Sequence, residues 1–257
     1  MIPAKKSLGQ HFLRDENIAR KIVNAFLAAS NCETILEVGP GTGALTKFLL
    51  EQPSFKYFAV ETDERMVTHL MAEFPILKEK LFHDDFLEFD FSKLKTNSIS
   101  IIGNFPYNIS SQILFRVFEH KEMIPMVTGM FQKEVALRIA AKHGNKDYGI
   151  LSVLLQAFYD VKYLFEVNEK SFSPPPKVKS AVIQLMRKKN PAHLKSELFF
   201  RELIKAAFNQ RRKMLRNSLN KFLTEDSVSQ EKIFNKRAEQ LSVDEWIDLA
   251  NDLFTKK

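Results

Sequence analysis

The sequence has little cysteine and little glycine, and it has no long apolar run. A single cysteine, Cys32, among 257 residues excludes an internal disulfide and argues against a thiolate metal site, so no bound metal is expected. No apolar run approaches the roughly 18 residues that a membrane span needs. The first residues show no apolar stretch of the signal-peptide kind. These absences predict a protein of the reducing cytoplasm with no membrane partner.

The few glycines are concentrated. Three of the eight lie within five positions, in the segment Glu37-Val38-Gly39-Pro40-Gly41-Thr42-Gly43-Ala44. The segment lies between an expected strand, residues 34–38, and an expected helix through Phe48 and Leu49. Glycines at such a point let the backbone turn sharply and approach a ligand. The pattern predicts a cofactor-binding loop.

Positive charge is also concentrated. The formal net charge is +7, and residues 187–221 alone hold eleven Lys and Arg against two Glu. A segregated basic block indicates a polyanionic partner, most simply nucleic acid, although a solvated helical face has the same composition. Within the block, Arg211, Arg212 and Lys213 are the expected RNA contacts.

Strand and helix patterns alternate over residues 15–185, which predicts an α/β fold with a parallel, doubly wound sheet. The expected strands are residues 34–38, 57–61, 80–83, 98–103 and 126–130, and a terminal antiparallel pair at 161–167 and 181–186. The loop between the last two contains Pro174-Pro175-Pro176, which is incompatible with a helix or a central strand.

Only helical patterns remain from about residue 195, and Asn190-Pro191 marks a plausible boundary. We therefore expect a Rossmann-like catalytic domain at residues 1–189 and a small, basic, helical RNA-binding domain at 190–257.

The acidic residues around the glycine loop bear on the identity of the cofactor. Gly39, Gly41 and Ala44 satisfy the dinucleotide fingerprint, so an NAD-dependent oxidoreductase is one interpretation. Glu37, however, is unfavourable beside a pyrophosphate and compatible with the sulfonium and ammonium of S-adenosylmethionine. Glu61 ends the second strand, where a carboxylate can accept both ribose hydroxyls.

Asp84-Asp85-Phe86, after the third strand, offers a carboxylate for an adenine amine and a ring to lie against adenine. Taken together, the set favours S-adenosylmethionine. Asp85 alone would be read as a helix cap or a turn residue.

Asn104-Phe105-Pro106-Tyr107 follows an apolar strand at the carboxyl edge of the sheet, where ligands bind in such folds. The tetrapeptide fits a pattern of methyltransferases that act on exocyclic amines. The Asn104 side-chain oxygen and the Pro106 carbonyl can each accept one N–H of an adenine N6, which aims its lone pair at the methyl group. The ring of Tyr107 can stack on a base removed from its helix. Positioning then carries the rate, with no general base.

Several segments together resemble the ribosomal RNA adenine dimethyltransferase family over essentially the whole chain. They are Leu8-Gly9-Gln10-His11-Phe12-Leu13, Glu37 to Gly43, Asn104 to Ser110, Phe172 to Ser180, and the basic Gln210-Arg211-Arg212-Lys213. The resemblance implies S-adenosylmethionine-dependent dimethylation of N6 in two adjacent adenosines near the 3′ end of small-subunit (16S) rRNA. It also implies a role in maturation of the small ribosomal subunit.

The resemblance also assigns residues. The implied cofactor contacts are His11, Leu13, Gly39, Gly41, Glu61, Asp85 and Asn104, to which the residue pattern adds Phe86. Asn104, Pro106 and Tyr107 are the implied catalytic residues, and Phe172 is either a second wall for the flipped base or a core aromatic. The chain departs from the family at Phe105, where Leu is usual, and at Asp84, where a small residue is common.

Two alternatives remain besides NAD chemistry. A large-subunit rRNA methyltransferase of the erythromycin-resistance type shares the fold, the cofactor and both loops. An assembly factor, whose binding to immature small subunits matters more than methylation, is the other. We expect a monomer, because the partner is itself large.

Overall fold

The computed structural model describes residues 2–30, 32–223 and 232–255. Its contacts divide the chain into two compact units. Unit 1 comprises residues 1–136 and 162–187, and unit 2 comprises residues 137–161 and 188–257. Residues 137–161, expected in the first domain, pack instead with the C-terminal residues. The chain therefore passes between the units three times.

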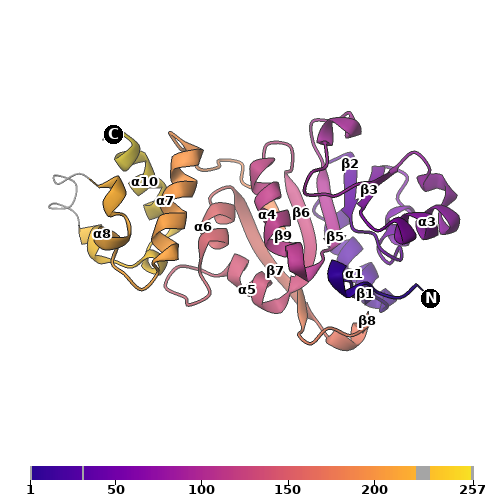
Figure 1. Ribbon diagram of the computed structural model, residues 1–257. Coiled ribbons are helices and arrows are strands. Elements are labelled where there is room, and N and C mark those ends of the chain that lie inside the picture. Colours follow the sequence, from indigo (N-terminus) through magenta and orange to yellow (C-terminus); the bar gives the residue numbers. More distant parts are fainter. Residues whose placement is uncertain (1, 31, 224–231, 256–257) are drawn as a thin grey trace. The chain divides into compact units, whose positions relative to one another are not determined.

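Seven strands form one sheet in the order β4-β3-β2-β5-β6-β9-β7 (Figure 1). The strands are β2 (Thr34–Val38), β3 (Lys56–Glu61), β4 (Leu81–His83), β5 (Ser100–Asn104), β6 (Met126–Gln132), β7 (Tyr159–Val167) and β9 (Ser180–Arg187). Neighbours from β4 to β6 pair in parallel, and β9 runs antiparallel to β6. The expected α/β, Rossmann-like fold is confirmed.

Helices alternate with the strands of the sheet. They are α1 (Glu16–Leu27), α2 (Thr46–Leu49), α3 (Glu64–Glu73), α4 (Ser110–Glu119) and α5 (Lys133–Ala140). Short 3-10 turns lie at Lys6–Leu8, Pro75–Leu77, Phe91–Leu94, Tyr107–Ile109 and Glu169–Ser171. Asp15 caps α1 as expected, because its carboxylate accepts the backbone N–H groups of Asn17 and Ile18. The buried face of α1 then packs on β6.

A second, two-stranded sheet ties the N-terminal segment to the proline-containing loop. Strand β1 (Phe12–Leu13) pairs antiparallel with β8 (Phe172–Ser173). The Arg14 N–H also donates to the Ser171 carbonyl over 2.8 Å. The N-terminal segment is thereby fixed at one end to a loop about 160 residues later in the chain.

The packing of Phe105 explains how this chain accommodates a large side chain beside the catalytic loop. Gly103 and Gly129 lie opposite each other in the β5–β6 pair. A Cβ on Gly129 would lie 2.1 Å from the Phe105 ring, and one on Gly103 would lie 2.7 Å from it. The ring, 1% exposed, thus fills the space that two missing side chains leave on the sheet.

Unit 2 is helical apart from the start of β7. Its helices are α6 (Ile150–Gln156), α7 (Glu197–Asn209), α8 (Leu215–Ser218) and α10 (Val243–Thr255), with 3-10 turns at Asn220–Phe222, Lys232–Asn235 and Ala238–Gln240. Helix α7 contacts both α6 and α10, which explains why residues 137–161 belong to this unit. Trp246, Tyr148 and Phe200 are fully buried in it. Within the described parts of the chain, no helix has the length and apolarity to cross a membrane.

Candidate functional site

The strand order places a crevice between β2 and β5. From β2 the chain continues outward to β3 and β4, whereas β5 and β6 lie on the other side of β2. Loops at the carboxyl ends of β2 and β5 therefore diverge, and ligands bind at such switch points. The cavity found there is lined by residues 8–13, Glu37, Gly39 to Thr42, Ala44, Leu45, Glu61, Thr62, Asp85 and Asn104 to Ile109.

The glycine loop adopts a backbone that only glycine takes readily. Gly39 and Gly41 have φ values of +67° and +56°. Nothing lies within 4 Å of where a Gly39 Cβ would be, so its backbone faces open space at the cavity. The Gly41 N–H donates to Glu61 Oε2 over 3.0 Å, which joins the loop after β2 to the end of β3.

Two buried carboxyls make the cavity electrostatically selective. Burial raises the pKa of Glu37 to about 7 and also raises the pKa of Glu61. Thr46 and Tyr57 donate hydroxyls to Glu37 Oε2, at 2.8 and 2.6 Å, and no described residue donates to Oε1. A cation at the cavity would relieve this accumulation of negative charge, and a pyrophosphate would worsen it. These two carboxylates fit the positively charged S-adenosylmethionine and argue against NAD.

The acidic segment after β4 contributes one of its two expected residues. Asp85 is exposed and lines the cavity, and its carboxylate also accepts the Leu87 N–H over 2.9 Å. Phe86 does not line the cavity. Its ring is 4% exposed and packs edge-on against Phe91, so the structure places it in the core. Asp84, the departure from the family pattern, pairs with Lys93 at 2.7 Å.

Asn104 ends β5, and its amide has a defined orientation. The side-chain nitrogen donates to the His11 carbonyl over 3.0 Å. Because a carbonyl can only accept, the amide nitrogen must face His11, which leaves Oδ1 as an acceptor without a partner among the described residues. His11 is itself held by Nδ1, which donates to the Pro174 carbonyl over 2.9 Å. The role of Asn104 Oδ1 as an acceptor of a ligand N–H stays a prediction.

The two residues after Phe105 are anchored as well. The Pro106 carbonyl accepts the Ser110 hydroxyl over 3.0 Å and the Ile109 N–H over 3.3 Å, so a further donor would share an acceptor that two groups already use. The Tyr107 hydroxyl lies 2.5 Å from Ser180 Oγ, and its ring lies 5.3 Å from the His11 ring between centroids. Ser180, at the start of β9, is a positioning partner that the sequence did not reveal.

A second, larger cavity of about 1030 Å³ adjoins the first. Both are lined by Gly9 to Phe12, Thr42 and Tyr107. The rest of its lining comes from Ile2 to Ala4, Arg14, Gln132 and Ser173 to Val178. Phe172 is not part of it. Its side chain is 4% exposed and belongs to the hydrophobic core, opposite Leu13 in the β1–β8 pair.

The N-terminal contacts bring His11 and Leu13 to the cavity as expected, and they involve residues that sequence reasoning missed. Leu13 is buried and lines the cofactor cavity. Asp63 forms a polar cluster with Gln10 and Arg65, and of these three residues Gln10 lines the cavity. Asp63 has a helix-capping position in the sequence, but nothing local indicates that Gln10, 53 residues earlier, is its partner.

In unit 2, the three basic residues predicted to contact RNA differ in environment. Arg211 Nη2 donates to the Asn145 carbonyl over 3.1 Å, and Arg211 Nε lies 3.5 Å from Glu239 Oε2. Arg212 and Lys213 are exposed. Arg211 therefore has a structural role in unit 2, whereas the side chains of the other two face solvent.

Comparison with known proteins gives matches over the whole chain. The family model described as ribosomal RNA adenine dimethylase matches residues 1–254. A curated relative from Cytophaga hutchinsonii, named ribosomal RNA small subunit methyltransferase A, is 51% identical over 256 residues, 99% of each chain. A relative of the same name from Flavobacterium johnsoniae is 49% identical over 98% of this chain and 96% of its own.

Solved structures agree with these matches. A dimethyladenosine transferase from Plasmodium falciparum superposes with a TM-score of 0.81 at 25% identity, covering 96% of this chain and 98% of its own. The 23S rRNA methyltransferase ErmE superposes with a TM-score of 0.69 at 21% identity, covering 94% of this chain and 99% of its own. The second likeness shows a shared fold.

Proposed function

The chain belongs to the ribosomal RNA adenine dimethylase family, and on that premise we propose that it dimethylates N6 of two adjacent adenosines near the 3′ end of small-subunit rRNA. It is an S-adenosylmethionine-dependent methyltransferase that acts on ribosomal RNA. The names of the curated relatives support the choice of the small subunit over the large. We also propose that the enzyme is a monomer, that it acts in the cytoplasm, and that it takes part in maturation of the small subunit.

The observation that carries the proposed chemistry is the fixed amide of Asn104. S-adenosylmethionine supplies a methyl group bonded to a positively charged sulfur. Asn104 Oδ1 accepts one N–H of the target N6, and the Pro106 carbonyl, which also accepts from Ser110 and Ile109, is the proposed acceptor of the other. Together they direct the nitrogen lone pair at that carbon. When bound, S-adenosylmethionine would supply the methyl group to this nitrogen, and the surplus proton of the nitrogen would leave to solvent. Orientation by these two acceptors is the contribution of the chain to the rate.

The residues that would hold the cofactor are those around the first cavity. Glu37 and the backbone of Gly39 and Gly41 lie where a cationic amino-acid group fits, and Glu61 and Asp85 lie farther along the sheet edge for ribose and adenine. His11 and Leu13 close the cavity from the N-terminal segment.

The second cavity is the proposed site of the target adenosine. Tyr107 lines both cavities, so a base stacked on its ring lies beside the cofactor, and such stacking contributes about 1–3 kcal/mol. Residues 173–178 also line this cavity, and Phe172 does not.

Unit 2 supplies the proposed phosphate contacts. Arg212 and Lys213 are exposed, and so are Lys142 and Lys146 in the loop whose Asn145 carbonyl accepts from Arg211. Arg211 thus joins two exposed basic segments of this unit into one surface. Lys and Arg on such a surface bind RNA by releasing counterions from phosphates.

The test is transfer of tritium from labelled S-adenosylmethionine into undermethylated small subunits, followed by nucleoside analysis. We expect label in dimethyladenosine, and its loss in Asn104→Ala. Asn97→Ala is the matched control, because Asn97 is an exposed asparagine before β5 and Asn104 ends the same strand. Label only in large-subunit RNA would indicate the resistance-type enzyme. No label, in a protein that binds both cofactor and subunit, would favour the assembly factor.

A further inference from the structure

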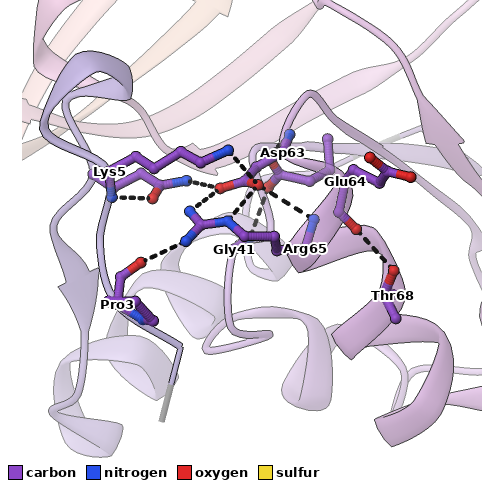
Figure 2. Close-up of polar contacts among 9 residues, drawn as sticks. Pro3, Lys5, Gly41, Asp63, Glu64, Arg65 and Thr68 are labelled. Atoms are coloured by element: carbon purple, nitrogen blue, oxygen red, sulfur yellow. Dashed lines mark hydrogen bonds and ion pairs between the residues drawn. The ribbon is translucent and has the colours of Figure 1, made fainter.

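A buried acid outside the cofactor cavity holds the N-terminal segment. The Asp63 side chain is 0% exposed, and its Oδ2 accepts Gln10 Nε2 over 2.9 Å. Its Oδ1 lies 3.5 Å from Lys5 Nζ. The Gln10 side-chain oxygen in turn accepts the Lys5 N–H over 2.8 Å. Figure 2 shows these contacts converging on Asp63 from the N-terminal segment.

Arg65 completes the cluster from the first turn of α3. Its Nε and Nη2 donate to the two Asp63 oxygens over 3.0 and 2.5 Å, and its Nη1 donates to the Pro3 carbonyl over 3.0 Å (Figure 2). The guanidinium holds the pKa of the Asp63 carboxyl well below its usual range, so the acid stays ionised. Pro3, Lys5 and Gln10 are therefore bound to one charged pair, and we call these contacts, with Asp63 and Arg65, the N-terminal latch.

The latch is connected to the cofactor cavity through the backbone. The Asp63 N–H donates to Glu61 Oε1 over 2.9 Å, and the other Glu61 oxygen accepts the Gly41 N–H. Glu61 is thus fixed from one side by the latch residue and from the other by the glycine loop. A shift of Asp63 would change the position of the proposed ribose-binding carboxylate.

The latch is also connected to the catalytic amide. Gln10 immediately precedes His11, whose carbonyl orients Asn104. The same segment lines both cavities, at Gly9 to Phe12. Neither Asp63 nor Arg65 lines either cavity. These two residues therefore affect the ligands only indirectly, through the segment that they hold and, for Asp63, through Glu61.

We propose that Asp63 and Arg65 are positioning residues that hold the N-terminal segment as a wall shared by the cofactor and the target adenosine. The identity of the two ligands rests on the proposed function. Beyond the latch, the described contacts of this wall are those of His11 with Pro174 and Asn104 and the β1–β8 pair. Loosening the latch therefore weakens binding of both ligands more than it displaces the catalytic loop.

The test separates the latch from the helix cap that Asp63 also provides. Asp63 accepts the Arg65 N–H at the start of α3. Asp63→Ser keeps a capping hydroxyl but cannot hold Gln10, Lys5 and the guanidinium. Arg65→Gln and Gln10→Ala break the latch from its two sides. Glu64→Gln is the control, because Glu64 is exposed in the same helical turn and its carboxylate points away from the latch (Figure 2).

Three measurements test the proposal. We expect the Kd for S-adenosylmethionine to rise about tenfold in each latch variant, as loss of a charged hydrogen bond predicts. The KM for small subunits should rise with it, while kcat at saturation changes far less. Trypsin should cleave faster at Lys5, whose ammonium the latch engages, with the melting temperature of the variant near that of the wild type.

Two results would overturn the proposal. The first is an unchanged Kd and an unchanged cleavage rate in Asp63→Ser and Gln10→Ala. The second is an equal effect in Glu64→Gln, which would assign the change to helix charge. If Asp63→Ser does not fold, Arg65→Gln decides, because Arg65 lines neither cavity and the Asp63 cap of α3 is kept. Cofactor binding and proteolysis need no RNA, so they test the latch even if the proposed rRNA substrate is wrong.

Discussion

Glu37 is a carboxylate in a place where a neutral side chain would be more stable. It is 2% exposed, and the two hydroxyl donors offset only part of the unfavourable effect of burial, so its pKa lies near 7. The folded protein therefore binds this proton more tightly than the unfolded chain does. The contribution of the group to stability is fully present below pH 4.5 and is lost as the pH rises through about 7.

Replacement of this carboxylate should change stability and cofactor affinity in opposite directions. We expect Glu37→Gln to raise the free energy of unfolding by up to about 3 kcal/mol at pH 8 and to change it little at pH 4. Cofactor affinity of the wild type should fall as the pH drops through 7, and that of the variant should be low and independent of pH. Thermal unfolding and calorimetric titration at both pH values measure these effects. A stability gain of equal size at both pH values would show that charge is not the cause.

Packing between neighbouring elements explains why the catalytic loop tolerates Phe105. We expect Gly129→Ala to destabilise the protein by about 1–3 kcal/mol, because the new methyl group overlaps a ring that Phe131 also contacts, at 4.9 Å between centroids. The cost should be much smaller in a Phe105→Leu background, because only the Phe131 ring, 2.9 Å from the added Cβ, then remains close. A double-mutant cycle by calorimetry measures the coupling, and strictly additive effects would contradict it.

The sequence predicted the elements whose signal is local and missed those that depend on distant partners. The strand at 34–38 and the glycine turn follow from an apolar run and from glycine itself. The β1–β8 pair joins two-residue strands about 160 residues apart, and nothing in either segment indicates the other. Phe172 was predicted as a wall of the base site or as a core aromatic. The structure places it in the core, because the β1–β8 pair sets it opposite Leu13.

The same limit applies to the side chains of the site. Asn104, Glu61 and Asp85 end or follow strands, and strand ends meet at one edge of a parallel sheet, so their proximity was predictable. Phe86 was assigned by its position beside Asp85, but its ring turned inward to the cluster around Phe91. The latch was not predictable, because Asp63 and Gln10 come together only through the course of the N-terminal segment.

At the scale of the whole molecule, charge is divided unevenly between the units. Residues 187–221 carry more positive charge than the chain as a whole, and all of them except Arg187 belong to unit 2. Association with RNA through this unit should therefore depend strongly on salt. The exposed members of the set determine that dependence, because Arg211 is already paired within the unit.

Replacement of Arg212 and Lys213 together by Gln should lower the slope of log K for small subunits against log salt by roughly 1.5, the value for two lost phosphate contacts. Arg211→Gln should change the slope less and lower the melting temperature more, because Asn145 and Glu239 lose their partner. Filter binding across a salt series and thermal unfolding make the comparison. Equal slopes for wild type and double variant would remove these two residues from the RNA surface.

The place of β9 in the sheet has a consequence for how the protein folds as it is synthesised. Strand β7 is made before β9, yet β9 lies between β7 and β6 in the finished sheet. A nascent chain that ends before Ser180 therefore has no partner for β7 and leaves one edge of β6 unpaired. Completion of the sheet must wait until residues 180–187 leave the ribosome, when most of the cofactor cavity has already been translated.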